Sequence, residues 1–382
     1  MSVDPAVVPL ALYLHFPWCV AKCPYCDFNS HGLRGAVPED AYVDSLIRDL
    51  AFELEQAEMR PITSIFMGGG TPSLFSGRAI ARVLEAFAAK LNFAPDIEIT
   101  LEANPGTVDA ANFRDYHAAG VNRLSIGVQS LDDAMLKRLG RIHGQGDVLR
   151  TVEIARNAGF DNLNLDLMYA LPQQSEAEAE ADLRAAIALA PEHLSYYQLT
   201  LEPNTEFAAR PPTLPDDDSA WAMQLAGQAL LADAGYAQYE VSAYAQAGRQ
   251  CRHNRNYWQF GDYLGIGAGA HGKRSASDGI ERRARHKLPR SYQAGAGTAT
   301  AVQEQRTLET ADLPFEFMMN ALRLNEGFTA ALFEARTGLP MSTIEPKLAK
   351  LAKRGLIEQV DGHTRPTSLG RAHLNTLVAE FL

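Results

Sequence analysis

The sequence has few cysteines, no long apolar run and no excess of basic residues. It holds 4 cysteines in 382 residues, and 35 Lys and Arg stand against 46 Asp and Glu, which gives a formal net charge of −11. No window is apolar over the roughly 20 residues that a membrane-spanning helix needs. The negative charge opposes general attraction to nucleic acid or to an anionic lipid surface. We therefore expect neither an integral membrane protein nor a general nucleic-acid binder.

The first residues, MSVDPAVVPLALYLHFPW, also lack the features of an export signal. No positively charged segment precedes the apolar run, and Pro9 and Pro17 interrupt it. We expect a cytoplasmic protein with no transmembrane segment, although peripheral contact with a membrane stays open. Because the cytoplasm is reducing, clustered cysteines there favour metal binding or catalysis over a structural disulfide.

Six β-rich stretches alternate with helical patterns through the first half of the chain. Strand–helix units in series are typical of a parallel sheet wrapped by helices, since right-handed crossovers return each helix to the sheet. The pattern predicts an α/β fold, a partial (β/α)6 barrel, whose strands lie at 12–15, 64–67, 97–101, 123–126, 162–167 and 194–197. In such barrels the segments that follow the strands carry the chemistry.

The rest of the chain is expected to form two further parts. The Pro- and Asp-rich stretch after Arg210 is typical of a linker, and residues 273–311 are rich in Arg, Gly, Ala, Thr and Ser, which predicts a surface excursion with a basic loop. Helical patterns at 312–324, 328–336 and 342–353, a β element near 357–360 and a final helix after Pro366 suggest a winged-helix-like α+β module. We therefore predict three domains, which are the partial barrel at 1–210, an extension of the barrel with the segment 253–258 and the basic loop at 211–311, and the winged-helix-like module at 312–382.

Three of the cysteines, Cys19, Cys23 and Cys26, lie within eight residues in CVAKCPYC. A disulfide between two of them would leave the third thiol unpaired. Structural zinc usually takes four ligands in separated pairs, but the only remaining cysteine, Cys251, lies far along the chain. Zinc stays open as an alternative. A 4Fe–4S cluster normally takes four thiolates, so three on one loop would leave one iron free to bind a substrate or cofactor.

The spacing C-x3-C-x2-C, directly after the first predicted strand, resembles the signature of the radical S-adenosylmethionine superfamily. That resemblance implies that Cys19, Cys23 and Cys26 hold a 4Fe–4S cluster whose open iron is chelated by S-adenosylmethionine. In the superfamily, an electron from the reduced cluster cleaves this cofactor to methionine and a 5′-deoxyadenosyl radical. The glycines of GGGTP would let the backbone approach a ligand and offer it hydrogen-bonding groups.

Longer segments narrow the resemblance to the oxygen-independent coproporphyrinogen III oxidase family, and within it to the HemW-type heme chaperone branch. They cover about residues 10–272 and include LYLHFPWCVAKCPYCDFNSH, NRLSIGVQS, NLDLMYALP and YLGIGAGAHG. Glu and Asp suit ribose hydroxyls or a cationic group, and Arg suits a carboxylate. The S-adenosylmethionine contacts implied are Tyr13, Tyr25, Gly69, Gly70, Thr71, Glu102, Gln129, Arg141 and Asp166.

Two features favour the chaperone branch over the oxidases. The oxidase pattern has a further cysteine where this chain has Phe28, and a longer segment precedes its cluster motif than the 18 residues found here. The second feature is HNRNYW at 253–258, which is similar to the HNxxYW pattern of the chaperones and implies heme contacts from His253, Asn254, Tyr257 and Trp258. An imidazole can ligate heme iron, and aromatic rings can cover a porphyrin face.

Basic residues near this motif are candidates for the heme propionates, namely Arg249, Arg252, Arg255 and the stretch 273–290. Thiolates also bind heme, but we expect Cys251 to be a spectator. His271 is expected to be structural or to line the site.

The leading hypothesis is a heme chaperone that binds heme and delivers it to apo-hemoproteins such as respiratory enzymes, with an electron donor still to be identified. Such a protein would be able in principle to cleave S-adenosylmethionine reductively, but its main role would be heme transfer. One alternative is oxygen-independent coproporphyrinogen III oxidase, which decarboxylates coproporphyrinogen III to protoporphyrinogen IX. Another is a cluster-containing DNA-binding regulator. The segment from Asp312 to Leu382 has as many acidic as basic residues, so it carries no net positive charge that would attract DNA phosphates. The DNA-binding alternative therefore has no support from charge.

Overall fold

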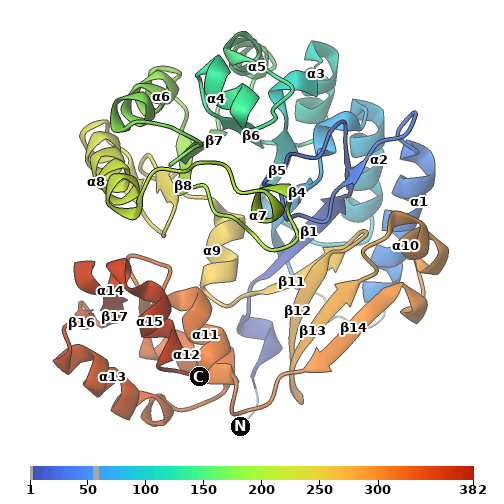
Figure 1. The fold of residues 1–382 in the computed structure, drawn as a ribbon. Coiled ribbons are helices and arrows are strands. Elements are labelled where there is room, and N and C mark those ends of the chain that lie inside the picture. Colours follow the sequence, from blue (N-terminus) through green and yellow to red (C-terminus); the bar gives the residue numbers. More distant parts are fainter. Residues whose placement is uncertain (1–2, 55–59, 108) are drawn as a thin grey trace.

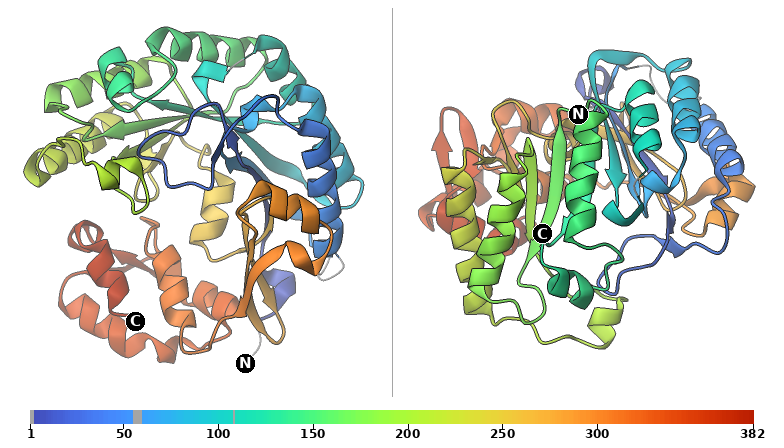
Figure 2. Two further views of the ribbon diagram at one scale, coloured as in Figure 1. Left: turned by 45° about the vertical axis from the view of Figure 1, so that its right-hand side comes forward. Right: turned by 90° about the horizontal axis from the view of Figure 1, so that it is seen from above.

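The computed structural model describes residues 3–54, 60–107 and 109–382. Its main feature is a 12-stranded sheet that curves into a partial barrel (Figures 1 and 2). The parallel strands at its centre are, in spatial order, β11 (Asp262–Ile266), β1 (Leu10–Phe16), β4 (Ile62–Gly69), β5 (Phe93–Ala103), β6 (Arg123–Gln129), β7 (Leu163–Tyr169) and β8 (His193–Gln198).

The six predicted strands correspond to β1 and β4 to β8, and the predicted α/β partial barrel is confirmed. These strands consist largely of buried residues, as expected for a parallel sheet covered on both faces. Strand β11 was not predicted; it comes from the later part of the chain and pairs with β1, so that Leu12 lies opposite Leu264. Its five residues contain a glycine and no alternation of polar and apolar side chains, so the periodicity was weak.

Helices cover the convex face of the sheet (Figure 2). Local hydrogen bonds fix where several of them begin: Ser76 Oγ accepts from the Ala79 N–H at 3.2 Å, and Ser175 forms a capping box with Glu178. The covering helices are α1 (Glu39–Leu54), α2 (Gly77–Ala88), α3 (Ala110–Ala118), α4 (Asp133–Arg138), α5 (Gln145–Asn157), α6 (Glu176–Ala188) and α8 (Asp217–Asp233).

Residues 273–311 extend the sheet, and the prediction of a surface excursion with a basic loop is wrong. Antiparallel strands β12 (His271–Ala276), β13 (Gly279–Arg285) and β14 (Val302–Thr307) follow β11, with α10 (Pro289–Gly295) between the last two. Lys273 lies 2.9 Å from Asp262, and Arg285 lies 2.8 Å from Asp49; all four side chains are at most 1% exposed. Buried charges need such partners, and the partner of Arg285 lies far away in the sequence.

The C-terminal module has three main helices and a hairpin, as predicted. Its apolar core includes Phe317 and Phe333 together with Phe260 and Val8 from outside it, so the module packs closely on the barrel. Its three-stranded sheet has the order β15–β17–β16. The elements are α11 (Leu313–Ala321), β15 (Phe328–Thr329), α12 (Ala330–Thr337), α13 (Glu345–Lys353), β16 (Ile357–Val360), β17 (His363–Pro366), α14 (Ser368–Ala372) and α15 (Leu374–Ala379).

Short elements complete the site's surroundings. Helix α9 (Arg252–Trp258) lies inside the curve of the sheet, between the barrel and the C-terminal module (Figures 1 and 2). The other short elements are β2 (Trp18–Cys19), β3 (His31–Gly32), α7 (Glu206–Ala209), β9 (Ala237–Gln238) and β10 (Ala243–Ala245). In the described part of the chain, none of the helices combines the length and apolarity that crossing a membrane requires.

Candidate functional site

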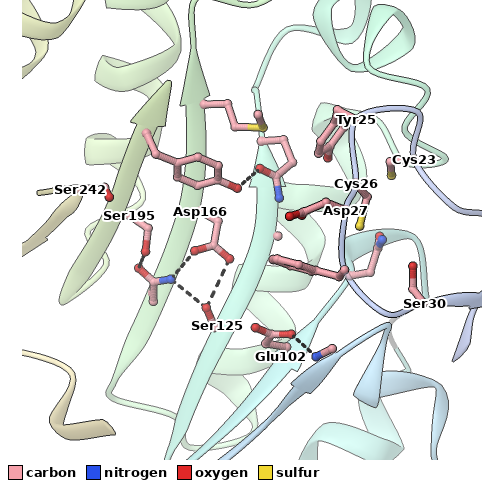
Figure 3. A pocket seen from close by; sticks show the side chains of 18 of the residues that line it. Cys23, Tyr25, Cys26, Asp27, Ser30, Glu102, Ser125, Asp166, Ser195 and Ser242 are labelled. Carbon is pink, nitrogen blue, oxygen red and sulfur yellow. Dashed lines mark hydrogen bonds between the residues drawn. The ribbon is translucent and has the colours of Figure 1, made fainter. Parts of the chain in front are cut away.

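A cavity of about 530 Å³ lies inside the curve of the sheet. This volume falls within the roughly 300–1,000 Å³ of typical ligand sites. Its wall is built from the cysteine loop, the inner faces of β4 to β8, helix α9 and one residue of the C-terminal module. Figure 3 shows that Cys23 and Cys26 face the same space as the half-buried carboxylates Glu102 and Asp166.

The three clustered cysteines lie at the end of β2, where Cys19 is the last residue, and on the loop between β2 and β3, which carries Cys23 and Cys26. Pairing of Trp18 with His31 closes the loop at its base, and Cys19, Cys23 and Cys26 all line the cavity as free thiols. No three His, Cys, Asp or Glu side chains within 3–54, 60–107 and 109–382 gather tightly enough to hold a single metal ion. A 4Fe–4S cluster binds each thiolate through a different iron. Its three cysteine ligands therefore need not converge on one point, and it is enough that they line the same wall of the cavity.

Two polar side chains reach the cysteine sulfurs. Thr71 donates its hydroxyl to Cys19 Sγ at 3.4 Å, and Arg141 Nη1 donates to Cys23 Sγ at 3.4 Å. Burial raises the pKa of the thiols of Cys19 and Cys26. A bound metal favours the thiolate, and donors such as these stabilise its charge.

The glycine segment after β4 lines the cavity, but its amides serve the fold. Gly69 has a φ of 112°, and a Cβ there would collide with the ring of His15. A Cβ on Gly70 would collide with the backbone of Trp18, and the Gly70 N–H donates to the carbonyl of Phe16 at 2.7 Å. The N–H groups of Gly69 and Gly70 therefore already have partners within the protein, and the contact of this segment with S-adenosylmethionine stays a prediction. The glycines let this turn pack against the start of the cysteine loop.

Glu102 and Asp166 both reach the cavity from neighbouring parts of the barrel wall. Glu102 accepts from the Gly69 N–H at 3.1 Å, while Asp166 accepts from Asn164 Nδ2 at 2.7 Å and Ser125 Oγ at 3.3 Å (Figure 3). Burial, together with the nearby Asp166, raises the pKa of Glu102 to about 8. This region therefore disfavours added negative charge and favours a cationic or hydroxyl-bearing group.

Arg141, Gln129 and Tyr25 line the same region as predicted. Arg141 Nη2 donates to the carbonyl of Gly127 at 2.7 Å, and its Nε is buried with no hydrogen-bond partner in the described residues. Gln129, at a φ of 71°, accepts from the Tyr197 hydroxyl at 2.8 Å. Tyr197 also lines the cavity and was missed; its place at the end of the sixth predicted strand was the available signal.

Tyr13, a predicted S-adenosylmethionine contact, does not line the cavity. Its ring stacks on Phe66 with centroids 6.4 Å apart, and Phe66 is the residue that lines the cavity. The Tyr13 hydroxyl forms a 3.0 Å hydrogen bond with Nδ1 of His15. A direct contact between Tyr13 and a ligand here would require that Phe66 move.

Helix α9 divides the HNxxYW motif between two faces, because residues four apart lie on the same side of a helix. Asn254 and Trp258 line the cavity. His253 is 1% exposed and lies behind it, with Nδ1 3.0 Å from Ser64 Oγ and Nε2 3.2 Å from the Tyr257 hydroxyl. Burial lowers the pKa of His253 to about 3, so the ring is neutral. The structure thus places two of the four predicted heme contacts at the cavity.

Two protein-family models and several known proteins are similar to this chain. The radical SAM superfamily model matches residues 13–186, and the HemN C-terminal domain model matches residues 308–373. Heme chaperone HemW of Escherichia coli K12 is 52% identical over 375 residues, which is 98% of each chain. The chain belongs to the HemW family. Heme chaperone HemW of Haemophilus influenzae is 47% identical and covers 99% of each chain.

A solved structure shares the fold of this HemW-family chain. Coproporphyrinogen III oxidase (HemN) from Escherichia coli, a radical SAM enzyme, superposes with a TM-score of 0.82 over 98% of this chain and 90% of that one, at 24% identity. This likeness confirms the predicted fold. The predicted resemblance to the wider family is confirmed by the two family models and by the HemW relatives.

In this HemW-family chain, the basic residues predicted to meet heme propionates lie outside the cavity. Arg249, Arg252 and Arg255 pair with acidic residues at 3.5, 2.6 and 2.6 Å, and the stretch 273–290 contributes nothing to the described lining. The structure therefore brings none of these residues to the cavity, and their contact with heme propionates stays a prediction. His271 is exposed at the start of β12.

Cys251 lies apart from the clustered cysteines. It is fully buried and outside the cavity lining, and its Sγ donates to Glu98 Oε1 at 3.4 Å. This placement fits the expected spectator role.

The C-terminal module supplies a cavity residue that was not predicted. Arg323 lines the cavity with its guanidinium 4.2 Å from the centre of the Trp258 ring, a cation–π contact. Its Nη2 pairs with Glu240 at 3.1 Å, and Glu240 also lines the cavity. No local pattern marks Arg323, because its partners come from a different part of the chain.

Proposed function

We propose that this chain is a heme chaperone that binds heme in the cavity and delivers it to apo-hemoproteins such as respiratory enzymes, carrying a 4Fe–4S cluster and S-adenosylmethionine. Its close relatives of full length bear the name heme chaperone HemW. The observation that carries the proposal is one cavity lined both by the three clustered cysteines and by Asn254 and Trp258 of the HNxxYW motif.

The residues present fit the cluster and its cofactor. Cys19, Cys23 and Cys26 would hold the cluster, which when bound and reduced supplies the electron that cleaves S-adenosylmethionine. The orphaned Nε of Arg141 suits a ligand carboxylate, since a guanidinium binds carboxylates through two donors. Glu102 and Asp166 suit hydroxyl groups or a cationic group of the cofactor.

Heme would lie toward the α9 side of the cavity. The indole of Trp258 offers an aromatic face for a porphyrin, and Asn254 offers a polar side chain beside it. His253 is the proposed iron ligand, on the condition that its ring releases Ser64 and Tyr257 and turns toward the cavity. Tyr257 then contributes by holding or releasing that ring.

An anaerobic heme titration of the reconstituted protein, followed by absorbance with and without S-adenosylmethionine, tests the proposal. We expect saturable heme binding, loss of bound heme to an added apo-hemoprotein, and no consumption of coproporphyrinogen III in the presence of a reductant. Consumption of the porphyrinogen with no heme uptake would overturn the proposal in favour of the oxidase activity of the fold relative.

A further inference from the structure

A buried guanidinium faces the cavity from the amino end of β6. Arg123 is the first residue of that strand, is 2% exposed and lines the cavity. Its Nε is buried without a partner, and in the part of the chain that the structure describes we find no hydrogen bond or ion pair to its guanidinium. A buried, unpaired cation is strongly unfavourable, so this arrangement suits an anionic ligand.

The two carboxylates that attract Arg123 already have other partners. Glu98 and Asp166 attract Arg123 electrostatically. Glu98 accepts from the backbone N–H of His253 at 3.1 Å, and Asp166 accepts from Asn164 at 2.7 Å. These carboxylates offset part of the charge of Arg123 but leave its donors available.

Two more donors line the same cavity. The indole Nε1 of Trp258 and the Nε of Arg323 are both buried without a hydrogen-bond partner in the described residues. The guanidinium of Arg323 lies over the Trp258 ring, and its Nη2 forms an ion pair with Glu240. Two guanidinium groups and an indole N–H are donors suited to a carboxylate.

Arg123 lies far from the cluster cysteines. Gln129, at the carboxyl end of β6, lies six positions further along the strand, which is about 20 Å at the usual rise of a strand. Figure 3 shows Ser195 and Ser242 on the opposite side of the pocket from Cys23 and Cys26. A carboxylate near Arg123 is therefore a different group from one bound beside the cluster.

We propose that Arg123, together with Trp258 and Arg323, forms a carboxylate-binding subsite that takes a propionate of the porphyrin. This inference rests on the proposed function, because it assigns one end of the proposed heme to this part of the cavity. The propionate displaces no existing partner of Arg123. The C-terminal module takes part directly, through Arg323.

The test compares protoporphyrin IX with its dimethyl ester, which has the same ring but no free carboxylate. Neither contains iron, so iron ligation does not enter. We expect the wild-type protein to bind the acid about tenfold to a hundredfold more tightly than the ester, and Arg123→Met to bind both like the ester. Arg123→Lys should keep part of the preference. Arg150→Met removes an exposed arginine and serves as the matched control.

Other outcomes separate the possibilities. Equal wild-type affinity for acid and ester, or no binding of the acid, overturns the subsite alone, whereas absence of heme binding in the titration described above overturns the subsite together with the proposed function. Weaker binding of S-adenosylmethionine, with porphyrin binding unchanged, would assign Arg123 to the cofactor instead and overturn the inference. If Arg123→Met does not fold, Arg323→Met tests the same preference from the partly exposed side of the subsite.

Discussion

Ser64 Oγ lies 3.0 Å from Nδ1 of His253 in a buried hydrogen bond that ties helix α9 to strand β4. If His253 ligates heme iron, it must break this bond, so the serine competes with the ligand. We expect His253→Gln to weaken heme binding at least tenfold while the cluster absorbance stays intact. Ser64→Ala should leave heme affinity unchanged or raise it by up to about tenfold, since one hydrogen bond contributes about 1 kcal/mol.

Anaerobic heme titrations of the two variants and the wild type measure both effects. Weaker heme binding in Ser64→Ala as well as in His253→Gln would contradict iron ligation by His253. It would show instead that the ring acts by holding α9, and with it Asn254 and Trp258, in position.

Stability should fall in mild acid because His253 is buried as a neutral ring. Its pKa is about 3 in the folded protein and about 6.5 in the unfolded chain, where it is solvated. Below pH ~6.5 the His253 ring of the unfolded chain therefore binds a proton, whereas the ring in the folded protein stays neutral. From this residue alone, the free energy of unfolding should fall by up to about 1.4 kcal/mol per pH unit down to pH ~3.

Urea unfolding of the cluster-free protein between pH 7 and 4.5 measures that slope. His253→Gln should have a shallower slope than the wild type, and His117→Gln, which removes an exposed ring from α3, is the matched control. Equal slopes in wild type and His253→Gln would show that His253 is already protonated in the folded state.

The sequence predicted the barrel and the cysteine end of the site because both depend on local patterns. Each parallel strand is a short apolar run, and Cys19, Cys23 and Cys26 share one loop, so neither needs a distant partner to be recognised. The environment of Arg285 was different, because its acidic partners on α1 lie more than 200 residues earlier. Composition alone could not distinguish its buried charge from a solvated one.

The same limit applies within the site. The HNxxYW motif was found as a unit, but only the direction in which α9 packs decides that Asn254 faces the cavity and His253 faces Ser64. Arg123 and Arg323 carry no local signal at all. Their significance comes from burial and from missing partners, which are properties of the folded chain.

The buried pair of Arg285 and Asp49 predicts that the basic stretch stabilises the fold rather than binding heme. Arg285→Met leaves Asp49 and Glu53 without their shared cation, and we expect a loss of about 3–5 kcal/mol in the free energy of unfolding. Arg290→Met removes an exposed charge from the same stretch and should change neither stability nor heme affinity. Urea unfolding checks the first expectation. A tenfold loss of heme affinity in Arg290→Met would restore a ligand-binding role for this stretch.

The four cysteines should separate into two groups by their role in cluster assembly. Cys19, Cys23 and Cys26 line one cavity, and each would ligate a different iron, so replacing any of the three by Ala should remove most iron and sulfide after anaerobic reconstitution. Cys251 is buried against Glu98 and outside that cavity, so Cys251→Ala should assemble the cluster at the wild-type level. Iron and acid-labile sulfide content measure the outcome, with near-UV circular dichroism to confirm folding. Wild-type iron content in Cys23→Ala would contradict the cluster, whereas loss of the cluster in Cys251→Ala with the fold intact would place that thiol among the ligands.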